Sequence, residues 1–423
     1  MKDLPRLAVL FVVFVDILGL GLMIPVLSEI LLDPGQKFLP NSVSGDRREL
    51  LYGTILGAFF FSWFFGAAFI SKLSDYIGRK SAILICLCGA FSGYLLTFLA
   101  LETSSVLLLL AGRVIGGFTA GNQPIAQAAL IDEAEDAQQK AKFMGQMVAA
   151  VAIGLVSGPL LTASLTSKAV MGESAGFELP VLAALMLVVV NIVLILRYFR
   201  ETLPARRKID FGPSEVFLTL VRVVQNPVTL RLAPVFFFAV MGFNAFYIFL
   251  DDFLIARFAF GAFKNSAVLV VLGATMGSVS LYLVGPVSRR FRSIDIIAVT
   301  VSIMIVFMTG YLLNQVAWLA FVLVIPIIAA FGITYPTFLS MFSASVDASR
   351  QGWAMGVCVA LYTLGSGSIS IAGGTATALD PALPLYIAIG SCALALALMT
   401  VLWRGNKAVL ALVSTEQSPD RAA

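Results

Sequence analysis

The sequence predicts an all-α polytopic membrane protein with twelve transmembrane helices in two six-helix bundles, related by pseudo-two-fold symmetry. Hydrophobic residues make up 59% of the 423 and charged residues only 12%, about half of the roughly 25% typical of a soluble domain. Apolar runs of membrane-spanning length recur along the chain, and the loops between them carry an uneven distribution of basic residues. Most of the surface is therefore expected to face lipid.

A membrane-spanning helix needs roughly 20 consecutive, mostly apolar residues. Twelve runs meet this requirement, with approximate limits of 7–27, 51–73, 81–101, 105–131, 143–165, 179–199, 230–252, 265–287, 294–313, 317–341, 353–377 and 383–403. The first run is longer than the roughly 7–15 apolar residues of a signal peptide, and no small-residue cleavage site follows it. We therefore interpret it as a retained first helix.

The basic residues predict the orientation, because Lys and Arg concentrate on the cytoplasmic side of membrane proteins. With the amino terminus inside, the cytoplasmic segments hold 21 of the 28 Lys and Arg residues and the opposite side holds 6. The remaining one, Arg113, lies inside a span. We expect both termini in the cytoplasm and a location in the plasma membrane, which in a bacterium is the inner membrane.

The longest predicted cytoplasmic connection, residues 200–229, separates an amino-terminal bundle (1–199) from a carboxy-terminal bundle (230–403) and a tail (404–423). Two echoes support duplicated halves. The sequence Asp-Tyr-Ile-Gly-Arg-Lys at 75–80, after the second span, is echoed by Gly-Pro-Val-Ser-Arg-Arg at 285–290, after the eighth. After the fourth and tenth spans, an Asp is followed by a basic residue and then by an aromatic residue and Met-Gly, at 132–145 and 347–356.

Two stretches have residues typical of segments that take part in gating or conformational change. In residues 71–80, Asp75 at a helix end and the cations Arg79 and Lys80 can hold neighbouring helix ends together, and Gly78 permits a tight turn. A solvated basic turn is the alternative. In the fifth span, Gly145, Gly154, Gly158 and Pro159 have the spacing Gly-x8-Gly-x3-Gly-Pro. Small residues at such intervals let helices approach closely, and proline bends a helix by removing a hydrogen bond.

These stretches resemble motifs of the major facilitator superfamily, and within it those of the twelve-span drug/proton antiporters that include tetracycline exporters. Two further stretches share the resemblance, Arg113 to Gly117 and the Asp-Ile-Leu-Gly-Leu-Gly-Leu-Met-Ile-Pro-Val-Leu segment at 16–27. The chain departs from the family pattern at Ser71, Tyr76, Thr162 and Ala163. The resemblance covers essentially the whole chain and implies alternating access, a solute bound between the bundles, proton coupling through Arg113, efflux, and a monomer.

Charges inside the spans are the candidates for proton coupling. Asp16 lies roughly 14 Å into the bilayer at about 1.5 Å per residue, and Arg113 reaches a similar depth from the other side, so we expect them to be partners. A structural arginine is the alternative for Arg113. The chain contains no histidine, so coupling must use carboxylates. Besides Asp16, the adjacent pair Asp251 and Asp252 could share a proton, or could lie solvated in the outer mouth.

Polar amides in the fourth span, Asn122, Gln123 and Gln127, are expected to touch the solute or to hydrogen-bond between helices. Phe243 and Tyr247 in the seventh span could form an aromatic contact with an amphipathic solute, although packing or lipid contact is the commoner use of such residues. We class these five residues as candidate substrate-binding residues.

The sequence therefore predicts a secondary active transporter, with proton-coupled efflux of a small amphipathic molecule as the leading hypothesis. Proton-coupled uptake, uncoupled facilitation of a metabolite and a non-transporting receptor-like protein on the same fold are the alternatives. We do not expect an enzyme, because the chain has no histidine, no visible metal-ligand cluster, and no Ser or Cys nucleophile beside a base. We expect no cofactor and no bound metal, with a proton gradient as the driving force. The expected partners are the solute and lipid, and not nucleic acid.

Overall fold

The computed structural model describes residues 4–133, 137–203, 223, 226–346, 351–404, 406 and 409. Within these ranges the regular elements are helices. The first half contains α1 (Leu4–Leu32), η1 (Pro34–Gln36), α2 (Gly45–Ile77), α3 (Arg79–Thr103), α4 (Val106–Phe118), α5 (Asn122–Glu133), α6 (Ala137–Thr166), α7 (Lys168–Met171), η2 (Gly172–Ser174) and α8 (Glu178–Tyr198). Most of the predicted linker, the predicted tail and residues 347–350 of the second echo lie outside the described ranges.

The second half contains α10 (Pro227–Ile248), α11 (Leu250–Phe258), α12 (Ala262–Tyr282), α13 (Val284–Arg290), α14 (Ser293–Leu313), α15 (Leu319–Ala344), α16 (Gln351–Leu379) and α17 (Leu383–Trp403). Across the described part of the chain, eleven helices are long and apolar enough to cross a membrane. The one predicted span missing from these eleven is the fourth, which corresponds to α4 and α5 together. The protein is therefore an all-α, multi-pass membrane protein.

Three spans that we expected to be continuous are each divided into two helices. The fourth breaks between α4 and α5, the seventh at Phe249 between α10 and α11, and the eighth at Leu283 between α12 and α13. Proline explains two of these breaks, because its ring clashes with the carbonyl four residues earlier and it has no N–H to donate. The carbonyl four residues before Pro124 is that of Ala120, and the carbonyl four residues before Pro286 is that of Tyr282. We have no such account of the break at Phe249.

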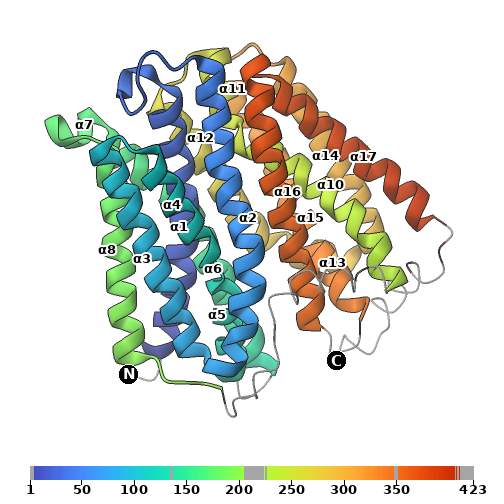
Figure 1. Ribbon diagram of the computed structural model, residues 1–423. Coiled ribbons are helices and arrows are strands. Elements are labelled where there is room, and N and C mark those ends of the chain that lie inside the picture. The colour runs from blue at the N-terminus through green and yellow to red at the C-terminus, as the bar shows by residue number, and fades with distance from the viewer. Residues whose placement is uncertain are drawn as a thin grey trace.

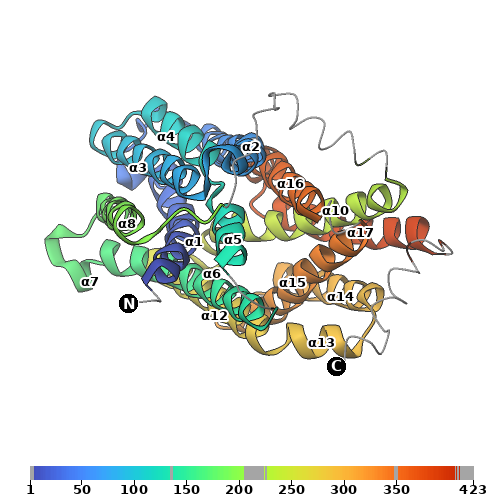
Figure 2. The same ribbon diagram turned by 90° about the horizontal axis from the view of Figure 1, so that it is seen from below.

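The helices cross the molecule side by side, so that it has two opposite ends (Figure 1). We call the end that carries the start of α1 and the end of α8 the terminal side, and the opposite end, which carries η1 and α7, the distal side. From the terminal side, the helices α1 to α8 group together and the helices α10 to α17 form a second group (Figure 2). This is the expected two-bundle arrangement.

The two bundles meet along two helix pairs, α2 with α16 and α6 with α12. Glycine makes both contacts close. A Cβ atom on Gly53 of α2 would clash with the Ser370 carbonyl of α16, and one on Gly273 of α12 would come within 3.0 Å of the Val156 nitrogen of α6. If the second six spans repeat the first, these pairs are the second span with the eleventh and the eighth with the fifth. The pseudo-two-fold relation exchanges the two pairs, as the repeat predicts.

Candidate functional site

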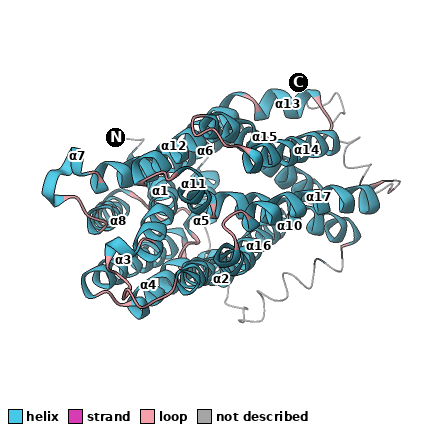
Figure 3. Cartoon of the chain, turned by 90° about the horizontal axis from the view of Figure 1, so that it is seen from above, coloured by secondary structure: helices cyan, strands magenta, loops and turns pink. Residues whose placement is uncertain are grey.

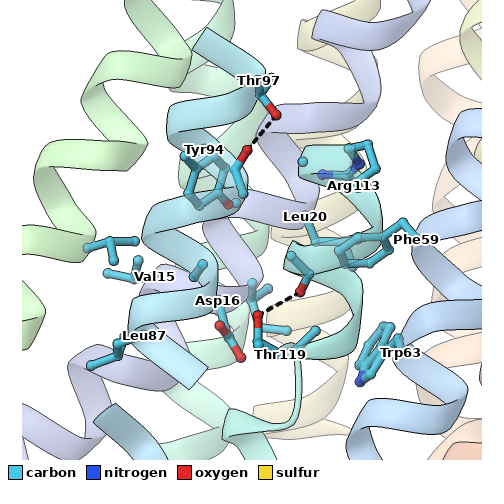
Figure 4. Close-up of a pocket in the computed structure, with 18 of the residues that line it drawn as sticks. Val15, Asp16, Leu20, Phe59, Trp63, Leu87, Tyr94, Thr97, Arg113 and Thr119 are labelled. Carbon is cyan, nitrogen blue, oxygen red and sulfur yellow. Dashed lines mark hydrogen bonds between the residues drawn. The ribbon is translucent and has the colours of Figure 1, made fainter. Parts of the chain in front are cut away.

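A small cavity lies within the first bundle and is lined by residues of α1, α2, α3, α4, the segment that joins α4 to α5, and one residue each of α5 and α8 (Figure 4). Its volume is about 60 Å³. Charged and hydrogen-bonding side chains reach it among apolar ones, namely Asp16, Trp63, Tyr94, Thr97, Arg113, Thr119 and Gln123. The cavity therefore holds one acidic and one basic side chain inside the predicted membrane-spanning region.

Asp16 is positioned by the close packing of α1 against α6. A Cβ atom on Gly154 would lie 2.7 Å from the Phe14 carbonyl oxygen, and one on Gly158 would lie 2.5 Å from the Leu18 carbonyl oxygen. The glycines of the fifth span thus let α6 approach α1 on both sides of Asp16. Gly145 has no such part, because a Cβ atom there would meet nothing within 4 Å.

The partner of the Asp16 carboxylate is an amide. Asn122 Nδ2 donates to Asp16 Oδ1 at 3.0 Å, and Asn122 is fully buried. Its own Oδ1 has no hydrogen-bond partner among the described residues. The α4–α5 break explains the geometry, because Asn122 is the first residue of α5 and begins a new helix at the level of Asp16.

Arg113 lies elsewhere in the same cavity. Its guanidinium carbon is 4.1 Å from the centre of the Phe59 ring, and its Nε has no hydrogen-bond partner in the described part of the chain. Figure 4 shows Arg113 beside the Phe59 ring, whereas Asp16 lies near Thr119. No ion pair joins these two described residues, so the pairing of Asp16 with Arg113 that we expected from their similar depth is not present in this structure.

The three amides of the fourth span separate. Gln123 lines the cavity and Asn122 contacts Asp16, but Gln127 is exposed and does not line it. The sequence reasoning missed Tyr94 and Trp63, which line the cavity together with Phe59. The available signal was the hydroxyl of Tyr94 in the middle of the third span, three residues before that of Thr97. Gly19 makes room for it, since a Cβ atom there would clash with the Tyr94 hydroxyl.

Asp251 and Asp252 lie away from this cavity, in α11 near the distal side. They are only 3% and 5% exposed, so the alternative of a solvated pair is wrong. Ser28 of α1 donates to Asp252 Oδ1 at 3.2 Å. The structure thus divides the four candidate proton-coupling residues between two locations, one inside the first bundle and one where the two bundles meet.

Phe243 and Tyr247 belong to an aromatic series in the second bundle. Phe243 stacks on Phe331, with 3.5 Å between ring centroids, and on Tyr247 at 6.0 Å. The series continues through Tyr335 and Tyr362 to Trp63 of the first bundle. Tyr362 also donates to Asn244 Oδ1 at 3.3 Å. These rings therefore form a wall that crosses from one bundle to the other.

The candidate gating residues at the terminal side make a connected network. Arg79 forms an ion pair with Asp75 at 2.7 Å and a second with Asp132, at the end of α5, at 3.3 Å. Gly78 has φ of 101°, a conformation that costs other residues strain. α2 ends, α3 begins and α5 ends at this side (Figure 1).

A carboxylate that the sequence analysis did not single out completes the network. Glu201, after α8, accepts hydrogen bonds from the backbone N–H groups of Arg79 at 2.8 Å and Lys80 at 3.3 Å. Lys80 Nζ donates to the Leu196 carbonyl at 3.1 Å. An acidic group at the start of α3 is favourable because a helix N-terminus has unpaired N–H groups and a positive dipole end.

Comparison with known proteins adds the family. The sequence model described as "Major Facilitator Superfamily" matches residues 9–370. The chain is 28% identical to the tetracycline resistance protein, class C, of Escherichia coli over 377 residues, which cover 85% of this chain and 86% of that protein. It is 26% identical to the quinolone resistance protein NorA of Staphylococcus aureus, over 90% of this chain and 92% of that one.

Solved structures agree on the fold. The human organic anion transporter MFSD10 (TETRAN) superposes with a TM-score of 0.71 at 19% identity, covering 94% of this chain and 99% of that one. A D-xylose-proton symporter superposes with a TM-score of 0.73 at 14% identity, covering 96% and 99%. At such low identity these structures establish the architecture alone.

Proposed function

Because the chain belongs to the major facilitator superfamily, whose members matched here are transporters, we propose that this secondary transporter exports a small amphipathic molecule in exchange for protons. The named relatives over most of the chain are resistance proteins for tetracycline and quinolone, and this similarity supports export. The glycine contacts of α6 with α1 support it too, because they use the spacing that resembles the antiporter motif. We further propose that both termini are cytoplasmic, from the distribution of basic residues, and that the protein acts as a monomer.

One observation carries the proton coupling: Asp16 lines a cavity within the bundle and has a neutral amide, not a cation, as its partner. A carboxylate at membrane depth is costly when ionised and unpaired. Arg113 is in the same cavity and its Nε is unpartnered. Protonation of Asp16 leaves the two apart, as in this structure. Loss of the proton leaves Asp16 negatively charged and attracts it to Arg113. Because Arg113 lies in α4 and the present partner of Asp16 lies in α5, this movement rearranges the break between α4 and α5.

The solute is proposed to bind outside the 60 Å³ cavity, because pockets for drug-sized ligands are typically about 300–1,000 Å³. The aromatic wall runs from Trp63 through Tyr362, Tyr335 and Phe331 to Phe243 and crosses the junction of the bundles. Asn244 and Tyr362 add polar groups to it. This combination suits a planar amphipathic molecule.

The test is solute-driven proton movement in vesicles that contain the purified protein and a pH-sensitive dye. With a proton gradient imposed, a panel of amphipathic solutes is added, and exchange predicts proton flux opposite to the solute flux. Asp16→Asn should abolish this flux and retain solute binding, whereas Glu173→Gln, at an exposed carboxylate far from the cavity, should behave like the wild type. Proton-driven transport that survives intact in Asp16→Asn would refute the coupling role.

The direction is tested separately in cells. Export predicts that cells expressing the protein accumulate less of a labelled solute than cells without it. Greater accumulation would instead support uptake, and equal rates with and without a proton gradient would support facilitation. A receptor-like protein would bind the solute without moving it.

A further inference from the structure

Four acidic residues gather where the bundles meet near the distal side. Asp251 and Asp252 come from α11 of the second bundle, and Glu29 of α1 and Glu49 of α2 come from the first. Glu29, Glu49 and Asp251 are all close enough to Asp252 to interact with it electrostatically, and we call these four residues the distal acidic cluster. Viewed from the distal side, α11 lies beside α1, in the middle of the molecule (Figure 3).

Asp251 and Asp252 are buried, Glu29 and Glu49 are half-buried, and none of the four has a basic partner among the described residues. Asp251 Oδ1, Asp252 Oδ2 and Glu49 Oε2 are buried without a hydrogen-bond partner in the described part of the chain. The cation adjacent to Glu49 in sequence, Arg48, gives its hydrogen bonds to the backbone carbonyls of residues 31, 39, 40 and 43 instead.

Uncharged groups complete the surroundings. The hydroxyl of Tyr311, from α14, interacts electrostatically with Asp251, is fully buried, and has no hydrogen-bond partner among the described residues. Tyr52 of α2 and Tyr247 of α10 also lie near the cluster. The carboxylates are not arranged to hold a metal ion in the described structure. A buried group of oxygens with unused hydrogen-bonding capacity is instead suited to a proton.

The cluster lies at a seam that holds the bundles together. Ser28 of the first bundle donates to Asp252 of the second at 3.2 Å, and the Tyr52 hydroxyl donates to the Ile248 carbonyl at 3.1 Å. The Tyr52 ring also meets Phe249 edge-on, with 6.1 Å between centroids. Opening the distal side must break these contacts and admit water to the carboxylates.

Protonation and closure are therefore linked. Burying an ionised carboxylate without a cation is expensive, and neighbouring negative charges repel each other. In the closed arrangement, proton binding neutralises the carboxylates and so removes the burial cost and the repulsion. In an open arrangement, water solvates the ionised carboxylates and screens their repulsion. We propose that the distal acidic cluster is a second proton-binding site, separate from the Asp16 cavity, and that proton binding there closes the distal side of the protein.

This inference deepens the proposed function and rests on its alternating-access cycle, but not on the role of Asp16 or on the direction of transport. In the proposed orientation the distal side faces the outer compartment. Protons taken from that compartment would close the protein towards the outside and turn it inwards, where the solute is collected. The cluster would thus supply the return step of an exchange cycle.

The test measures distal opening directly. Nitroxide labels are attached to Leu50→Cys in α2 and Leu379→Cys in α16, both exposed at the distal side, after the four native cysteines are replaced by alanine. Dipolar electron paramagnetic resonance then reports the distance between the labels in lipid nanodiscs from about pH 8 to about pH 5, a range chosen around the values at which buried carboxylates titrate. The wild type is expected to shift towards the short distance as the pH falls.

The variants separate proton binding from simple packing. Asp252→Asn cannot ionise, so the short distance should persist to a pH at least about one unit higher, since removal of a buried like charge shifts such equilibria by one unit or more. Asp251→Asn and Glu49→Gln should shift it in the same direction and serve if Asp252→Asn fails to fold. Tyr52→Phe should lower the closed fraction at every pH and keep the pH dependence. Glu173→Gln should match the wild type.

Two results would overturn the inference. One is a wild-type distance that does not change with pH, and the other is a pH response in all three carboxylate variants that equals that of Glu173→Gln. The Asp16→Asn vesicle assay is independent of both. Failure there with a normal spectroscopic response would reject the proposed coupling residue alone.

Discussion

Asn122 donates a hydrogen bond to Asp16, with 3.0 Å between Nδ2 and Oδ1, and this bond ties the first residue of α5 to the middle of α1. The bond joins two different helices, α1 and α5. It therefore depends on the break in the fourth span, which places the start of α5 at the level of Asp16. It also gives the half-buried Asp16 carboxylate the one hydrogen-bond donor that the described structure assigns to it.

The Asp16–Asn122 bond should be measurable as a coupling energy. In a double-mutant cycle of Asp16→Ala and Asn122→Ala, we expect a coupling of about 0.6 kcal/mol and no more than about 1.7 kcal/mol, the range known for hydrogen bonds between membrane helices. Reversible unfolding in bicelles measures it. A cycle of Asp16→Ala with Gln123→Ala, which lines the same cavity, should give none. Equal couplings in the two cycles would contradict the bond.

The contact of Arg113 with the Phe59 ring should stabilise the fold. A cation over an aromatic face contributes about 0.5–2 kcal/mol. Phe59→Leu should therefore lower the free energy of unfolding by about 0.5–2 kcal/mol less in an Arg113→Leu background than in the wild type. Trp63→Leu serves as the control, because Trp63 lines the same cavity and its ring contacts are with aromatic side chains. Its cost should be the same in both backgrounds. The measurement is the free energy of unfolding of each variant in both backgrounds, and equal costs of Phe59→Leu in the two would contradict the contact.

The two ends of the glycine series in α6 should respond oppositely to alanine. Gly158→Ala introduces a Cβ atom 2.5 Å from the Leu18 carbonyl, so α1 must move away, and we expect a loss of about 1–3 kcal/mol. Gly145→Ala meets open space and should stabilise the helix by up to about 1 kcal/mol. Thermal unfolding compares them. A tolerated Gly158→Ala would show that the α1–α6 contact is loose.

Glu201 should stabilise the start of α3. Glu201→Ala removes the acceptor for the N–H groups of Arg79 and Lys80, and loss of a capping acceptor costs about 0.5–2 kcal/mol. Glu102→Ala, an exposed carboxylate at the other end of α3, should change stability by less than about 0.5 kcal/mol. Unfolding free energies of the two variants provide the comparison, and equal losses would exclude a capping role.

The sequence predicted the helical membrane fold well, because apolar runs of about 20 residues have few other uses. It also singled out Asp16, Arg113 and Asn122, since polar groups inside apolar spans are conspicuous. It could not predict which of them touch. Depth along a span treats the span as a straight rod, but Pro124 breaks the fourth span between Arg113 and Asn122, and the partner of Asp16 changes with that break.

Contacts between distant segments were also beyond the sequence. Ser28 and Asp252 are 224 residues apart, and only the meeting of the two bundles brings them together. The same meeting buries Asp251 and Asp252, which from the sequence alone were equally compatible with bulk water. Glu201 gave no signal because an acidic residue after a helix is usually solvated.

The separation of Asp16 from the distal acidic cluster has an energetic consequence. A cycle that loads one proton at each would carry two protons for every solute molecule. With a neutral solute, two elementary charges would cross the membrane per turnover, and the voltage would act on both. At about 2.3 kcal/mol per charge per 100 mV, such a pump would keep working when the pH difference vanishes, with membrane potential as its sole energy source.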